Sequence, residues 1–428
     1  MKMLSRIGMV GMAVILLLLS LAVGCGDDDD ELVPLAEPTV EQQSTLAPSE
    51  HMEEVVIKIG NHTDKTGPGT NAMQYVNMAL ADTIEYYNEN NLIPGVEVEL
   101  IEYDGQADPS KDLPGYEWLK QRGADLITTW YPAVAMTLKS HVEEDGIPLF
   151  AGIVRKEILS PPEHLFITST LLDDTGWTMI KWVAENHWDY QTNGPAKIGG
   201  ACWDVDDGGV IFDAIERYAE LHPEQMEWVS GHITTVGSFT WSAEVEALKN
   251  CDYIWLPFLP GAFIREYYQA GHKTATFLGS DAQLTFLGMI RDMDLFDELD
   301  GSLFLMINEW WNEEGEFPDM INQLVRDKHP DSYETIIQAG KGYMAVMNSV
   351  FIMEIVKSAA DAVGPENLDA AAIYETAQSA TLMLDGVQRL SYSETKRTSP
   401  DRVAVFEVRG ADEDIFRITD WFPVDTPP

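Results

Sequence analysis

The sequence predicts an α/β protein with two doubly wound parallel-sheet lobes. Strand-like segments alternate with helical segments through most of the chain, and this β-α-β-α order is typical of a parallel sheet covered by helices on both faces. About 370 residues follow the N-terminal region, which is more than one hydrophobic core usually covers. The alternation therefore indicates two lobes, one for each of two series of elements.

The first series extends to about residue 168. Residues 96–103 alternate polar and apolar side chains, as a half-exposed strand does. The expected strands are residues 54–60, 96–103, 125–129 and 147–151. The expected helices, with apolar residues at helical spacing, are residues 71–90, 109–123 and 132–145.

The second series has the same order. Its expected helices are residues 174–186, 209–222, 242–250 and 262–270, and its expected strands are residues 196–202, 226–234, 253–258 and 276–278. A long helix at 340–363, a helix at 370–379 and strands at 402–408 and 415–421 follow. The last two strands predict an antiparallel edge hairpin on one lobe.

The N-terminus reads as an export signal. Lys2 and Arg6 precede an uncharged apolar run at 7–24, and Cys25 and an acidic block follow. The run Leu21-Ala22-Val23-Gly24-Cys25 resembles a bacterial lipoprotein box, which implies that residues 1–24 are removed and that Cys25 carries lipid. An uncleaved anchor helix is the alternative. Both interpretations place the folded part outside the cytoplasm, and residues 25–54, which are acidic and rich in Pro, Ser and Thr, are expected to form a flexible tether.

The charge excludes one class of partner. Asp and Glu total 71 against 27 for Lys and Arg, giving a formal net charge of −44, so no basic patch could offset the field and nucleic acid is excluded. Cys202 and Cys251 fall at opposite ends of their predicted strands. We therefore expect two small buried side chains and not a disulfide.

No enzyme motif is present. The sequence lacks a G-x-S-x-G elbow, a P-loop, H-E-x-x-H and paired Cys/His spacing, so no catalytic residue, metal or cofactor is expected. The residues that could in principle hold a metal lie at strand ends and are Asp104, Asp204, Asp206 and Asp207.

In open α/β sheets ligands bind at the carboxyl ends of strands. The corresponding loops here are residues 61–71, 130–133, 152–156, 203–209, 258–261 and 279–283.

With these loops in order, residues 55–422 resemble the type I periplasmic binding proteins, specifically the leucine/isoleucine/valine-binding-protein-like subfamily. The matching segments are residues 65–68, 103–109, 144–149, 204–208 and 267–273. The resemblance implies a hinge of three crossovers near residues 171, 306 and 398. Lobe I would then comprise 55–171 and 307–398, and lobe II 172–306 and 399–428. It also implies a monomer that delivers a small molecule to an ABC-type membrane permease.

The resemblance further implies ligand contacts from lobe I. The loop after the first strand contains Thr66, and the loops that carry Ser or Thr in the family read Trp130-Tyr131-Pro132-Ala133 and Ile153-Val154-Arg155 here. The hydroxyls have been replaced, and the guanidinium of Arg155 suits a carboxylate bidentately. A surface salt bridge with Glu157 is the alternative for Arg155.

In lobe II the family's acidic residue that meets a ligand amino group corresponds to Asp281. A helix N-cap is the alternative role for Asp281. The family's aromatic residues correspond to Asp207 and Leu256, so Phe258, with Trp130 and Tyr131, is expected to shape the pocket, unless these three side chains belong to the core.

The function predicted from the resemblance is extracytoplasmic capture of a small polar ligand, an amino acid or a related carboxylate or amide, by closure of two lobes. If Asp281 only caps a helix, a carboxylic acid without an amine is favoured. The alternatives are a ligand-sensing lipoprotein that feeds a membrane receptor and a hydrolase of small molecules.

Overall fold

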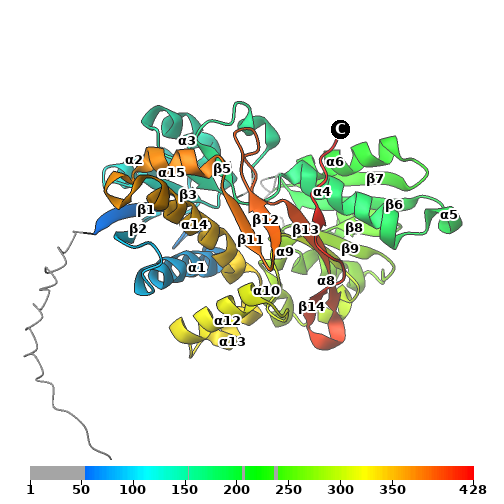
Figure 1. Cartoon of the computed structure of the whole chain (residues 1–428). Coiled ribbons are helices and arrows are strands. Elements are labelled where there is room, and N and C mark those ends of the chain that lie inside the picture. Colours follow the sequence, from blue (N-terminus) through cyan, green and yellow to red (C-terminus); the bar gives the residue numbers. More distant parts are fainter. Residues whose placement is uncertain (1–53, 153, 205–207, 236–239) are drawn as a thin grey trace, which may run out of the picture. The chain divides into compact units, whose positions relative to one another are not determined.

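The computed structural model describes residues 54–428 apart from 153, 205–207 and 236–239, and Figure 1 shows its elements. The first sheet is parallel, with strand order β2-β1-β3-β4-β5. Its strands are β1 (Val55–Thr63), β2 (Val96–Asp104), β3 (Leu126–Thr129), β4 (Leu149–Ala151) and β5 (Leu165–Ile167). Every residue of β3, β4 and β5 is buried, as expected for a parallel sheet covered on both faces.

The connections of this sheet are helical. They are α1 (Thr70–Glu89), the 3₁₀ turn η1 (Pro109–Lys111), α2 (Asp112–Lys120), α3 (Pro132–Asp145) and the 3₁₀ turn η2 (Lys156–Leu159). Pro132 opens α3 at the first helical position, where its missing N–H has no partner to lose. The helix predicted at 132–145 is thus confirmed with its bounds.

The second sheet is mixed. Its strand order is β14-β13-β10-β9-β8-β6-β7, with β15 paired to β13. The strands are β6 (Ala196–Trp203), β7 (Met226–Thr234), β8 (Tyr253–Trp255), β9 (Thr276–Ser280), β10 (Leu303–Met306), β13 (Arg402–Arg409), β14 (Asp414–Arg417) and β15 (Phe422–Pro423). Strands β6 to β10 are parallel, whereas β13 is antiparallel to β10 and β14. The predicted antiparallel edge hairpin is confirmed.

Helices also connect the strands of the second sheet. They are α4 (Leu172–Trp182), which continues as the π-helical turn η3 (Val183–His187), α5 (Tyr190–Asn193), α6 (Gly208–Leu221), α7 (Ser242–Leu248), α8 (Gly261–Gln269), α9 (Asp281–Leu284), α10 (Leu287–Asp292) and α11 (Phe296–Leu299); the 3₁₀ turn η6 (Gly410–Asp412) joins β13 to β14. Helix α4 packs on α6. Cys202 and Cys251 are buried and form no disulfide, as the sequence predicted.

Within the described residues the chain passes between the two sheets three times: after β5, after β10 and after β12. The second and third passages are separated by α12 (Glu316–Lys328), α13 (Tyr333–Ala339), η4 (Gly342–Ala345), α14 (Val346–Val363), η5 (Pro365–Asn367), α15 (Ala370–Ala377) and the hairpin of β11 (Thr381–Leu384) and β12 (Val387–Ser391). Helix α14 packs on α1 and α15, so this stretch returns to the first sheet before the chain crosses for the last time.

Three predicted elements need correction. The helix expected at 340–363 starts at Val346, because Gly340 has φ of 114°, which no right-handed helix contains, and residues 342–345 form the 3₁₀ turn η4. The strand expected at 253–258 ends at Trp255, since Pro257 has no N–H for the ladder. The strand expected at 415–421 ends at Arg417, because the Val405 N–H donates to the Thr419 hydroxyl at 3.0 Å.

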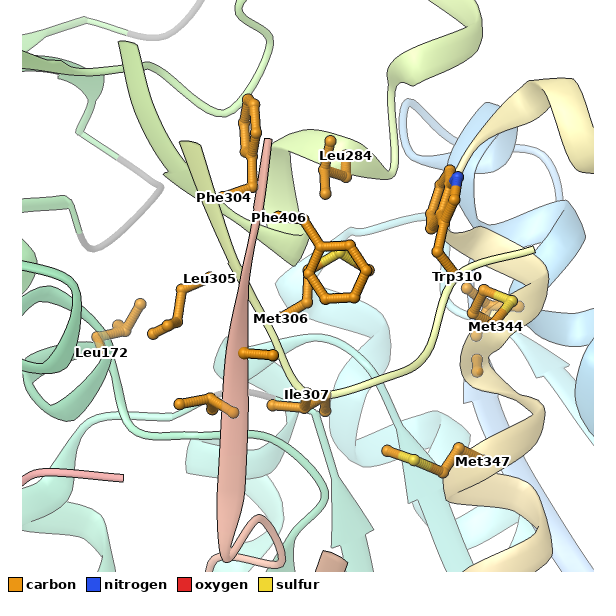
Figure 2. Packing of buried hydrophobic residues seen from close by; sticks show 14 of the residues in the cluster. Leu172, Leu284, Phe304, Leu305, Met306, Ile307, Trp310, Met344, Met347 and Phe406 are labelled. Atoms are coloured by element: carbon orange, nitrogen blue, oxygen red, sulfur yellow. The ribbon is translucent and has the colours of Figure 1, made fainter. Parts of the chain in front are cut away.

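One apolar cluster reaches from the second sheet into the returning stretch. Figure 2 shows Met306 and Ile307 at the end of β10, Phe406 on β13, and Met344 and Met347 on η4 and α14. All five side chains are buried in the same hydrophobic core. The second passage is therefore packed into the core and anchored by it.

Candidate functional site

The candidate site begins in the loop after β1, which Asp64 organises. Asp64 is fully buried. Its carboxylate accepts hydrogen bonds from the N–H groups of Gly67 and, at 2.8 Å, Gly69, and from the Tyr131 hydroxyl at 3.3 Å. Sequence analysis missed this residue, although an Asp directly after a buried strand and before Gly-Pro-Gly is a readable loop-capping signal.

Gly69 lets Tyr131 approach this loop. A Cβ atom at residue 69 would lie 2.0 Å from the Tyr131 hydroxyl, so only glycine fits the position. Burial, together with the nearby Asp64 carboxylate, raises the pKa of Tyr131 above its ordinary value. The phenol therefore stays neutral at physiological pH and remains a hydrogen-bond donor to Asp64.

Thr66 lies on the exposed side of the same loop. Its hydroxyl donates to Asp104 Oδ2 at 2.6 Å and accepts from Gln106 Nε2 at 2.6 Å. Burial opposes ionisation of Asp104, but hydrogen bonds from Thr66, Lys65 and Gln106 outweigh it and lower the pKa of that carboxyl. The Thr66 hydroxyl thus joins the end of β2 to the loop after β1.

Strands β3 and β4 end side by side and present Trp130 and Arg155. Thr129 pairs with Ala151, and the Gly152 N–H donates to Thr129 O at 2.9 Å. Trp130 and Tyr131 are half-buried against the core, and Ala133 is exposed in the first turn of α3. Arg155 is exposed and immediately precedes η2. The aromatic side chains and the guanidinium therefore follow adjacent strand ends.

The predicted residues of the second sheet differ in accessibility. Leu256 is buried, and its backbone bonds Leu278 O and Gln283 Nε2 at 2.9 and 3.0 Å. Phe258 is half-buried and meets Phe286 edge to face, with ring centroids 4.8 Å apart. Asp207, like Cys25, lies outside the described residues. An accessible aromatic surface follows β8, although not at the position the family pattern gives.

Asp281 already has a cationic partner. Ser280, and not Asp281, is the N-cap of α9, and it forms a capping box with Gln283, so the alternative role of Asp281 as an N-cap is wrong. The Asp281 carboxylate pairs with the Lys341 ammonium, and the two side chains are 13% and 15% exposed. Sequence analysis missed Lys341.

Two surface cavities lie near these loops. The first, of about 320 Å³, is lined by Asp64, Lys65, Thr70, Gln74, Asn77, Met78, Ala81 and Glu102. The second, of about 290 Å³, lies between the start of α1, the segment 285–292 and α13. No predicted site residue that the structure describes lines either cavity. The strand ends remain the candidate site, because Trp130, Tyr131 and Arg155 follow the ends of the adjacent strands β3 and β4.

Among the described residues, no group of three or more His, Cys, Asp or Glu side chains is placed to hold a metal ion. Across the same residues, no helix has the length and apolar character needed to cross a membrane.

The family model described as "Periplasmic binding protein" matches residues 56–413. None of the curated proteins matches the chain.

Many solved structures are similar to the chain. A branched-chain amino acid ABC transporter protein from Thermus thermophilus with bound valine has a TM-score of 0.73 at 14% identity, with 86% of this chain and 97% of that chain covered. A solute-binding protein from Rhodopseudomonas palustris HaA2 in complex with p-hydroxybenzoic acid has a TM-score of 0.71 at 14% identity, covering 87% and 98%. A fatty acid ABC transporter substrate-binding protein from Thermomonospora curvata has a TM-score of 0.69 at 16% identity, covering 86% and 92%. At these identities the likeness shows the fold, and the predicted two-lobed α/β architecture is confirmed.

Proposed function

This chain belongs to the periplasmic binding protein family, and from that premise we propose that it captures a small carboxylate-bearing ligand for an ABC-type permease. Members of the family bind solutes and are not enzymes, so no catalytic step is assigned. The observation that carries the ligand class is Arg155, an exposed residue four positions beyond the end of β4, whose neighbour in the sheet, β3, is followed by Trp130 and Tyr131.

Arg155 suits a carboxylate because its planar fork presents two parallel N–H donors. Trp130 and Tyr131, which follow the neighbouring strand β3, offer apolar surface at low conformational cost, since each has few rotatable bonds. Valine and p-hydroxybenzoic acid, bound in two of the similar structures, differ in that one has an amino group and an aliphatic side chain and the other an aromatic ring and a phenol, but both carry a carboxylate. This shared group supports a carboxylate as the part of the ligand that the first lobe recognises.

Closure of the two lobes on the ligand is the proposed mechanism. Lobe I, at 55–171 and 307–398, would carry Thr66, Trp130, Tyr131, Ala133 and Arg155. Lobe II, at 172–306 and 399–428, would carry Asp207, Leu256, Phe258 and Asp281. A ligand that touches both lobes stabilises the closed form by its differential affinity. Small-angle scattering checks this proposal, and an unchanged radius of gyration at saturating ligand would count against it.

We further propose that lipid on Cys25 anchors the protein to the outer face of the cell membrane, with residues 25–54 as the tether. The small residues before Cys25 and the acidic, Pro-rich stretch after it support this proposal. Mass spectrometry of the native N-terminus checks it, and a Cys25 without acyl chains would overturn it.

Arg155→Ala tests the ligand class. A bound ligand at one hundred times its Kd stabilises the fold by about 2.7 kcal/mol, so a thermal-shift screen of small carboxylates against the purified protein identifies the best ligand. Loss of a charge-assisted hydrogen bond costs about 1.5–3 kcal/mol, so we expect the variant to weaken binding by roughly ten- to a hundredfold, with Arg155→Lys intermediate.

Arg217→Ala is the matched control. Arg217 is exposed on α6 and pairs with Glu220 of the same helix at 3.2 Å, so the variant removes one surface guanidinium away from the candidate site. Equal affinity of Arg155→Ala and Arg217→Ala for the best carboxylate would refute the assignment.

A further inference from the structure

Lys341 and Asp281 form an ion pair that bridges two parts of the fold. Asp281 is the first residue of α9, directly after β9 of the second sheet. Lys341 lies between α13 and η4, and η4 packs on α1 of the first sheet. Both side chains are largely buried. The carboxylate that the family pattern assigns to a ligand amine is therefore occupied by a cation of the chain itself.

The backbone holds Lys341 in place independently of this ion pair. The Lys341 N–H donates to Leu284 O, the last residue of α9, at 3.1 Å, and the Trp311 Nε1–H donates to Gly340 O at 3.4 Å. A Cβ atom at Gly340 would lie 2.3 Å from Leu284 O, so glycine is required for this close approach. The peptide bond between Gly340 and Lys341 thus has both its N–H and its C=O hydrogen-bonded, and it holds the Lys341 side chain beside Asp281.

A ligand ammonium would have to compete with this arrangement. One carboxylate cannot neutralise two buried cations, and an uncompensated buried charge is strongly unfavourable. Expelling the Lys341 side chain would also break its ion pair with Asp281, although the hydrogen bonds of the main chain keep the residue in position. A ligand without an amino group meets neither obstacle, because it leaves the pair intact.

We propose that Lys341 is a specificity-determining residue whose ammonium occupies Asp281 and thereby selects carboxylates without an amino group over the corresponding α-amino acids. This inference rests on the proposed function, since it assumes that a carboxylate binds beside Asp281. The Lys341 ammonium takes the place beside Asp281 that the ammonium of an amino acid ligand would otherwise take.

Isothermal titration calorimetry with matched ligand pairs tests the inference. Each pair differs only by the amino group: 4-methylpentanoate and leucine, 3-phenylpropanoate and phenylalanine, and 4-hydroxyphenylacetate and 4-hydroxyphenylglycine. For the pair that binds best, we expect the purified protein to bind the amine-free member at least tenfold more tightly. In Lys341→Met we expect the ratio of the two affinities to move at least tenfold towards the amino acid, because Asp281 then lacks its cation.

Two further variants separate specificity from a general structural effect. Lys273→Met removes an exposed lysine after α8 and should leave the affinity ratio unchanged. The double variant Asp281→Leu/Lys341→Met replaces the pair by apolar groups without leaving a buried charge. It should keep the wild-type preference, since no carboxylate remains for an amine.

The outcomes are distinguishable. Tighter binding of the amino acid by the wild-type protein, an unchanged ratio in Lys341→Met, or the same shift in the single and double variants would each overturn the inference while leaving carboxylate binding in place. If no member of any pair binds, the proposed ligand class fails, and the inference fails with it.

Discussion

Neutralising Asp174 should stabilise the protein at neutral pH. Asp174 lies in the first turn of α4, is 7% exposed, and its Oδ1 has no hydrogen-bond partner among the described residues. Burial, with a smaller contribution from neighbouring Asp173, raises the pKa of Asp174 to about 6. Each pKa unit corresponds to about 1.4 kcal/mol, so relative to an ordinary carboxyl the buried charge costs about 3 kcal/mol above pH 6. The helix N-terminus offsets only about 0.3–1 kcal/mol of such a cost.

The pH dependence has a definite sign. Below about pH 4 the carboxyl is protonated in both the folded and the unfolded chain, so it does not change the free energy of unfolding. As the pH rises from about 4 to 6, the unfolded chain releases this proton first, and the stability that the protonated carboxyl gives the folded state is lost.

We therefore expect Asp174→Asn to match the wild type at pH 4 and to exceed its free energy of unfolding by about 2–3 kcal/mol at pH 7. Urea denaturation at pH 4, 5, 6 and 7 measures this difference. Asp213→Asn, at an exposed aspartate of α6, controls for the loss of one negative charge. A gain below about 1 kcal/mol at pH 7, or a gain that does not depend on pH, would refute the reasoning.

Two other variants test the packing around the passages and the site. Arg389→Met should lower the free energy of unfolding by about 3–5 kcal/mol, because Arg389 and Glu309 form an ion pair with side chains only 1% and 7% exposed. Urea denaturation should show that stability recovers in the double variant Glu309→Leu/Arg389→Met. A cost below about 1 kcal/mol for the single variant would contradict a structural role of the pair. Gly69→Ala should lower the free energy of unfolding by about 1–3 kcal/mol, because the added methyl group overpacks against the Tyr131 hydroxyl. Urea denaturation of Gly69→Ala/Tyr131→Phe should show most of this stability restored. Purely additive losses of stability in the double variant would contradict the contact.

Long periodic elements were predictable from the sequence. Strand 226–234 and helix 132–145 have the predicted bounds, because each shows one clear hydrophobic period. Helices α9, α10 and α11 have four to six residues, too few for a helical period to appear. Strand β10, Leu303–Met306, is buried throughout, and periodicity cannot separate such a run from a buried helix.

One missed element did carry a signal. Helix α12 has Glu316 and Asp319 in its first turn, Arg326 and Lys328 in its last, and a buried apolar stripe between them. This charge order matches the helix dipole. The alternation of strands and helices does not indicate this helix, because it lies after both series.

The candidate site was less predictable because its key contacts join distant residues. Asp281 was singled out, but its partner Lys341 is 60 residues away, and their pairing depends on how the segment after α13 packs against α9. Asp64 and Tyr131 are likewise separated by 67 residues. Sequence spacing cannot supply such pairs, whereas the strand ends that carry them follow directly from the βα order.

The contacts among the three passages indicate how a change in lobe orientation would be transmitted. The first passage is joined to the third, because Ile167 O accepts from the Ser399 N–H at 2.8 Å and from the Tyr392 hydroxyl at 3.1 Å. The second is joined to the third, because Arg389 Nη2 donates to Ile307 O at 2.7 Å. A rotation concentrated in one passage would break these buried hydrogen bonds, each of which is costly to leave unmade. The passages must therefore move together, and the backbone changes of any closure are expected in the short segments next to these bonds.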